Sequence, residues 1–156
     1  MSASVTNPAI LLVDDEPDIL HLLRLIIKSL ATSHTILTCA DGNVALEQAM
    51  QQPTPLVITD YNLPGMNGLQ LTAALKAHAP ATRVVLISGY ISPDLERRAR
   101  DRGVDYVVRK PFQVDSLIQI VRAALAPDSS GASLLSSGPL SAVLRAHPPQ
   151  STTPSW

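Results

Sequence analysis

Several features are scarce in this sequence of 156 residues, and each scarcity excludes a class of protein. A single cysteine, Cys39, excludes a disulfide within the chain, so a reducing compartment is the simplest expectation. The first apolar run, residues 9–13, is too short for a signal peptide or a membrane span. We therefore expect a cytoplasmic protein that does not enter a membrane. The net charge of −1 gives no reason to expect binding to DNA.

Aromatic residues are also rare, at 3% of the chain, whereas 46% of the residues are hydrophobic. The core must therefore consist mainly of leucine, isoleucine, valine and alanine. The length fits one domain of ordinary size with a short appendage.

Short β-type runs alternate with segments of helical periodicity. Continuous apolar or β-branched runs predict strands at 9–13, 34–40, 56–59, 83–87 and 104–108. Apolar residues at helical spacing predict helices at 17–30, 43–50, 67–78, 93–102 and around 117–125. This alternation is typical of a parallel sheet covered by helices on both faces. In such sheets the working site lies at the carboxyl ends of the strands, where the strand order reverses.

Charged and hydroxyl side chains follow four of the five predicted strands. They are Asp14, Asp15 and Glu16 after the first strand, Asp60 after the third, Ser88 after the fourth and Lys110 after the fifth. Several carboxylates in one crevice repel each other, and a hard cation such as Mg²⁺ would relieve that repulsion. An aspartate can act as a nucleophile toward phosphorus, while a lysine and a hydroxyl can hold the phosphoryl oxygens.

Each of these residues also has a plainer interpretation. Acids after a strand suit the positive end of a helix dipole, which would account for Glu16 and Asp18. A serine there is often a helix cap, and a lysine is often only solvated. The coincidence of all four positions at strand ends favours a site.

These residues fall within stretches that resemble the receiver domain of bacterial two-component response regulators. The matching stretches are LLVDDEP (11–17), LVITDYNLPGMNG (56–68), VVLISGY (84–90) and VRKPF (108–112). The resemblance covers about residues 8–126. It implies an α/β, flavodoxin-like (βα)5 fold, a three-layer sandwich whose parallel five-stranded sheet has the order 2-1-3-4-5.

The resemblance also implies roles for individual residues. Asp60 corresponds to the phosphoacceptor. Asp15 corresponds to a direct Mg²⁺ ligand, as does Asp60 itself, and Asp14 would act on the metal through water. The backbone carbonyl of Asn62 would complete the protein ligands.

Two further strand ends carry family positions. Ser88 corresponds to the switch hydroxyl and Lys110 to the family's lysine. The bond from Lys110 to Pro111 is typically cis in the family. The implied chemistry is self-catalysed phosphorylation and dephosphorylation of the aspartate, not that of a conventional enzyme.

One position departs from the family pattern. A switch aromatic usually lies three residues before the lysine, where this sequence has Val107, and Tyr106 comes one residue earlier. A step of one residue turns a side chain to the opposite face of a strand. Either Val107 replaces the aromatic or a bulge brings Tyr106 into its place. We favour the first alternative.

The ends of the chain differ in character from residues 8–126. Residues 1–7 are expected to be a flexible N-terminus. Residues 127–156 are rich in proline and serine and are expected to be a disordered tail, in which 140–147 could form a transient helix. This tail is too short and too polar for a DNA-binding output domain.

The resemblance implies a sensor histidine kinase or a histidine phosphotransfer protein as phosphoryl donor, and an unidentified protein as target. The face formed by the fourth helix, fifth strand and fifth helix would report the change, and dimerisation through it is possible. A stand-alone receiver is the leading interpretation, and a module of a hybrid kinase or longer regulator is the alternative.

Two unrelated classes of protein fit the sequence less well. A phosphatase of the haloacid dehalogenase type needs Asp-x-Asp after a strand, but here Asn62 takes the second position. A flavin-binding module would need a Gly/Ser/Thr phosphate loop after the first strand, where three acids stand instead.

Overall fold

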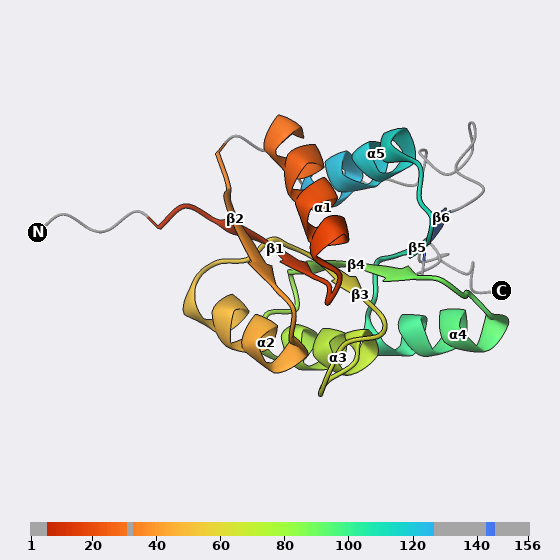
Figure 1. Cartoon of the computed structure of the whole chain (residues 1–156). Helices are drawn as coiled ribbons and strands as arrows, with labels where there is room; N and C mark the ends of the chain where they lie inside the picture. Colours follow the sequence, from red (N-terminus) through yellow and green to blue (C-terminus); the bar gives the residue numbers. More distant parts are fainter. Residues whose placement is uncertain (1–5, 31–32, 127–142, 146–156) are drawn as a thin grey trace, which may run out of the picture.

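The computed structural model describes residues 6–30, 33–126 and 143–145, and its centre is a twisted sheet (Figure 1). Five strands run parallel in the order β2-β1-β3-β4-β5, and a sixth strand pairs antiparallel with β5. Their bounds are β1 Ala9–Val13, β2 Thr35–Cys39, β3 Leu56–Asp60, β4 Arg83–Ser88, β5 Tyr106–Arg109 and β6 Val143–Arg145. The predicted flavodoxin-like order 2-1-3-4-5 is confirmed, and β6 extends it.

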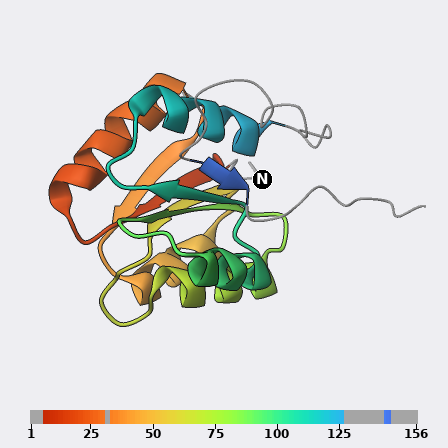
Figure 2. The ribbon, with the colours of Figure 1, turned by 90° about the vertical axis from the view of Figure 1, so that its right-hand side faces the viewer.

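Helices cover both faces of this sheet, as Figures 1 and 2 show. On one face lie α1 (Pro17–Leu30) and α5 (Val114–Leu125), and on the other lie α2 (Gly42–Gln51), α3 (Gly68–His78) and α4 (Pro93–Arg102). The strands β1 and β3 are buried over their whole length, which explains why their sequences are continuous apolar runs. The result is the predicted three-layer sandwich.

The strand order of the sheet reverses between β1 and β3. After β1 the chain adds β2 on one side, and then it crosses over to place β3 on the other side of β1. The helices that follow β1 and β3 consequently leave to opposite faces of the sheet. In sheets of this type, the carboxyl ends of the strands at such a point are the usual place for a binding crevice. Asp14 follows β1 directly, and Asp60 is the last residue of β3.

The tail contains one described element, a short strand. Residues 143–145, inside the segment expected to be disordered or transiently helical, form β6. A transient helix was only a possibility for 140–147, and these three residues are a strand instead. The other tail residues, expected to be disordered, lie outside the described part. The reason is tertiary: the outer edge of β5 offers backbone hydrogen-bonding groups, and strand pairing outweighs a weak local helical preference.

Candidate functional site

The carboxyl ends of β1 and β3 bring three aspartates together. One carboxylate oxygen from each of Asp14, Asp15 and Asp60 can be chosen so that all three lie within 4.8 Å of one another. The Asp14 side chain is fully buried and Asp60 is 7% exposed, whereas Asp15 is exposed to solvent. Two charges are thus held in the crevice, and a third lies at its mouth.

Lys110 reaches into this cluster from the residue after β5. Its Nζ lies 3.0 Å from Asp14 Oδ2, 3.3 Å from Asp60 Oδ1 and 3.4 Å from Glu16 Oε1. The Lys110 backbone N–H donates to the Ser88 carbonyl at 2.8 Å, and the Lys110–Pro111 peptide bond is cis. One ammonium group therefore bridges the acids at the carboxyl ends of β1 and β3.

Burial and neighbouring charges shift the ionisation of both bridged groups. Burial raises the pKa of the Asp60 carboxyl, the negative charge of Asp14 adds to this, and Lys110 opposes it. Burial works to lower the pKa of the Lys110 ammonium, but the hydrogen bonds and charges of Asp14 and Asp60 together raise it. Asp60 is therefore poorly solvated, with a neighbouring cation to stabilise its charge.

Gly68 allows α3 to begin against the end of β3. A Cβ at this position would lie 2.5 Å from the Asp60 carbonyl oxygen and 2.7 Å from Leu86 Cδ1. The loop is fixed by two hydrogen bonds of 2.8 Å, from Tyr61 N–H to the Ile87 carbonyl and from Gly68 N–H to the Tyr61 carbonyl. The loop LPGMN therefore closes tightly behind Asp60, which holds the carboxylate at the edge of the sheet.

Ser88 lies at the same edge, with its hydroxyl hydrogen-bonded within its own loop. The sheet register pairs Asp60 with Ile87, so Ser88 stands one residue beyond the end of β3. The Ser88 side chain is buried, its Oγ–H donates to the Tyr90 carbonyl at 2.9 Å, and Oγ accepts from the Tyr90 N–H at 3.3 Å. The serine is near the acidic crevice, but its hydroxyl is bonded to the loop that leads into α4.

Val107 and Tyr106 point to opposite faces of β5. The pairing of β4 with β5 runs through Tyr106, Val107 and Val108 without interruption, so β5 has no bulge. Val107 is 1% exposed and packs with Leu95 of α4, whereas Tyr106 packs on the opposite face, with the cluster beneath α1 and α5. Val107 therefore faces α4, and Tyr106 faces the other side of the sheet.

Asn62 and Glu16 each lie two residues along the chain from one of the clustered aspartates. Asn62 is exposed in the loop after β3, and its carbonyl remains a predicted metal ligand. The helix dipole is the plainer sequence interpretation of Glu16, and in the structure its carboxylate also contacts Lys110. Because the Glu16 side chain is 62% exposed, this pair is weak. Its place directly after Asp15 is the only signal that could have suggested this contact.

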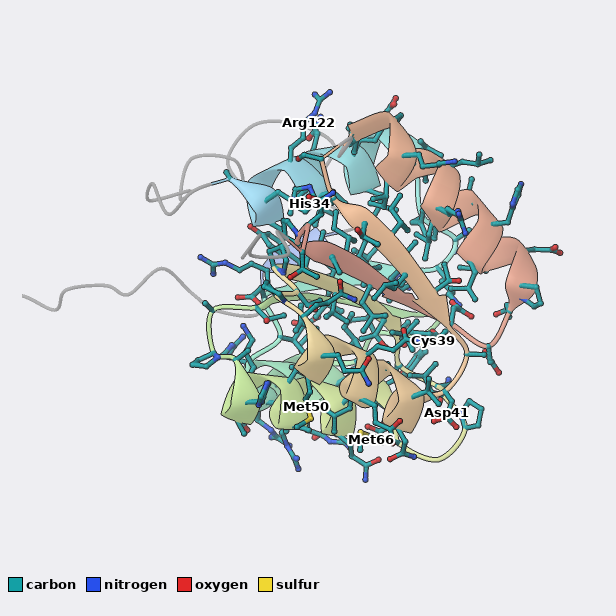
Figure 3. All side chains as sticks on the ribbon, turned by 90° about the vertical axis from the view of Figure 1, so that its left-hand side faces the viewer. His34, Cys39, Asp41, Met50, Met66 and Arg122 are labelled. Carbon is teal, nitrogen blue, oxygen red and sulfur yellow. The ribbon has the colours of Figure 1, made fainter. Side chains whose placement is uncertain are left out.

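The end of β2 contributes structural support. Asp41 caps α2, accepting hydrogen bonds from the backbone N–H groups of Asn43 and Val44 at 2.8 and 3.2 Å. A Cβ on Gly42 would lie 2.5 Å from the Met66 carbonyl oxygen, so the start of α2 touches the loop behind Asp60 (Figure 3). Burial raises the pKa of the nearby Cys39 thiol to about 11.

Comparison with known families matches this architecture. The model of the response regulator receiver domain matches residues 10–122. The transcriptional regulatory protein KdpE of Mycobacterium tuberculosis is 34% identical over 125 residues, which cover 80% of this chain and 54% of KdpE. The DNA-binding response regulator MtrA of Mycolicibacterium smegmatis is 30% identical over 88% of this chain and 60% of MtrA. The chain thus spans little more than half the length of these curated relatives.

Solved structures show the same fold. The signal receiver domain of an HD domain-containing protein from Pseudomonas fluorescens Pf-5 superposes with a TM-score of 0.70 and 28% identity, covering 80% of this chain and 91% of that one. The chemotaxis protein CheY4 of Vibrio cholerae has a TM-score of 0.69 at 23% identity, covering 76% of this chain and 98% of CheY4. Among the described residues, no helix has the length and apolar character needed to cross a membrane.

Proposed function

The chain belongs to the response regulator receiver domain family of two-component signalling, and we propose that Asp60 is the residue that accepts its phosphoryl group. The observation that carries this proposal is the contact of Lys110 Nζ with both Asp60 and Asp14 at the carboxyl edge of the sheet. Such an ammonium group can neutralise the oxygens of a phosphoryl group bonded to Asp60.

The transfer itself is a substitution at phosphorus. A carboxylate oxygen of Asp60 forms a bond to the phosphorus of a phosphohistidine, the phosphorus–nitrogen bond breaks, and the imidazole leaves. Asp60 must be deprotonated to attack, and Lys110 at 3.3 Å stabilises that form. The histidine belongs to a partner, for which we propose a sensor histidine kinase or a histidine phosphotransfer protein.

The donor set of the crevice fits a hard divalent cation. Carboxylate oxygens are the ligands that Mg²⁺ prefers. The three aspartates carry more negative charge than the single ammonium group of Lys110 can neutralise. We propose Asp15, Asp60 and the Asn62 carbonyl as direct ligands. Both oxygens of Asp14 already accept hydrogen bonds, from Glu16 N–H and Lys110, which favours contact through water. When bound, Mg²⁺ would offset negative charge on the phosphoryl oxygens.

The proposed readout is the face formed by α4, β5 and α5. Only Leu95 and Ala99 of α4 are buried, whereas α5 buries five residues, so α4 is the less firmly anchored helix. Ser88 would act as the switch by exchanging its bond to the Tyr90 carbonyl for one to the phosphoryl group. A downstream protein or a second receiver would then bind the altered face.

A labelling experiment tests the assignment. The full chain is incubated with acetyl phosphate and Mg²⁺, and addition of one phosphoryl group is followed by intact mass. We expect the unmodified chain to be labelled and Asp60→Asn to remain unlabelled. Asp41→Asn is the matched control, because asparagine caps a helix as well as aspartate and the cap lies at the neighbouring strand end. Labelling of Asp60→Asn at the unmodified rate would contradict the proposal.

A further inference from the structure

The C-terminal strand β6 covers an edge of the sheet that would otherwise be open. Its three residues pair antiparallel with β5 in the register Tyr106–Arg145, Val107–Leu144 and Val108–Val143. Figure 2 shows β6 alongside β5, with α5 on one side of the sheet and α4 on the other. The first five strands alone would leave β5 as the outermost strand.

The backbone of β5 presents hydrogen-bonding groups toward that edge. The Lys110 N–H donates to the Ser88 carbonyl, on the β4 side of β5. Because successive N–H groups of a strand point to opposite sides, the Val108 N–H also faces β4 and the Val107 N–H faces the outer edge. An uncovered edge of this kind, on a strand as apolar as YVVR, is a ready site for adding another strand.

The cover is short. It consists of three residue pairs. So few pairs give a strand little stability of its own, which leaves β6 easy to displace. β6 lies directly against Val107, the residue beneath α4, and β5 leads straight into Lys110.

We propose that the outer edge of β5 is a strand-docking surface and that the chain's own segment Val143–Arg145 is its reversible occupant. This inference rests on the proposed function. A protein that binds across β5 on the readout face must first displace this segment. Docking and phosphorylation would then influence each other, because both act on β5.

Nuclear magnetic resonance of the full chain tests the docking directly. We expect nuclear Overhauser contacts between the backbones of residues 107 and 144. Leu144→Pro removes a backbone N–H and disfavours pairing. It should speed hydrogen exchange of the Val107 amide roughly tenfold while the Val108 amide, bonded toward β4, changes less than about twofold. Ala132→Pro, a proline outside the three paired residues, is the matched control and should change neither.

Each other outcome overturns the proposal. Absence of contacts between 107 and 144 in the unmodified chain would mean that the edge is not occupied. Equal exchange of Val107 in both proline variants would mean that β6 does not protect it. Contacts seen only between differently labelled copies would assign the occupant to a second molecule. None of these results depends on Asp60, so labelling of Asp60 by acetyl phosphate separates this failure from failure of the proposed function.

Discussion

Replacement of Gly68 by alanine should destabilise the domain by about 2 kcal/mol. The new Cβ would lie 2.5 Å from the Asp60 carbonyl oxygen and 2.7 Å from Leu86 Cδ1, both closer than normal contact. Overpacking typically costs about 1–3 kcal/mol, and a backbone oxygen in a strand cannot rotate away, so the upper half of that range applies. Because Gly68 begins α3 with an ordinary φ, alanine's better helix propensity offsets up to about 1 kcal/mol.

Urea denaturation measures this change as a fall of about 1 M in the unfolding midpoint. Gly89→Ala is the matched control, because a Cβ there would meet nothing within 4 Å, and we expect its midpoint to stay within about 0.5 M. Since the displaced carbonyl oxygen belongs to Asp60, Gly68→Ala should also slow labelling by acetyl phosphate. This labelling is measured without urea, where the variant is fully folded. Equal midpoints for the two variants would refute the claim that α3 is packed against the end of β3 without room for a methyl group.

Two further predictions concern groups away from the acidic crevice. Asp105→Asn should lower the free energy of unfolding, measured by urea denaturation, by about 2–3 kcal/mol. The reason is that buried Asp105 neutralises Lys76 at 2.9 Å and Arg83 at 3.3 Å. Asp94→Asn, which removes only exposed pairs on α4, should cost less than about 1 kcal/mol, and equal losses would contradict this view. The Cys39 pKa of about 11, against an ordinary 9.0, means roughly hundredfold less thiolate at pH 8, so a disulfide reagent should react far more slowly with the native than with the urea-unfolded chain. Above pH 9 the unfolded chain loses this proton first, so stability should decline from pH 9 to pH 11; equal native and unfolded thiol reactivity would exclude the shift.

Most strand positions could be predicted because a parallel strand that is buried on both faces has a continuous apolar sequence. The run at 56–59 ends at Asp60, and the structure ends β3 at that residue. The fifth strand was predicted two residues too early, since Val104 is apolar and fully buried. Val104 packs in the cluster beneath α4 rather than in the sheet, and a sequence pattern reports burial without saying which neighbours cause it.

The sequence predicts which residues gather at the edge of the sheet, but it does not predict the hydrogen bonds that they form there. The topology of a parallel sheet dictates that residues after β1, β3, β4 and β5 gather, and Lys110 indeed contacts Asp14 and Asp60. No sequence rule states that the Ser88 hydroxyl donates to the Tyr90 carbonyl. Nor could β6 be foreseen, because its partner is an edge that exists only after the sheet has formed.

Val107, at the position where the family resemblance predicts an aromatic, bears on how a change at Asp60 could reach α4. Val107 is packed in the cluster beneath α4 and has no long side chain to rotate between two positions. The remaining connection is the backbone between β4 and α4, where Ser88 holds Tyr90 through two hydrogen bonds and Ser92 caps the helix two residues later. If the Ser88 hydroxyl turned to a phosphoryl group on Asp60, both bonds to Tyr90 would break, and the first turn of α4 would lose its fixed start. In this chain the signal to α4 would therefore pass through the loop at residues 89–92, which joins β4 to α4.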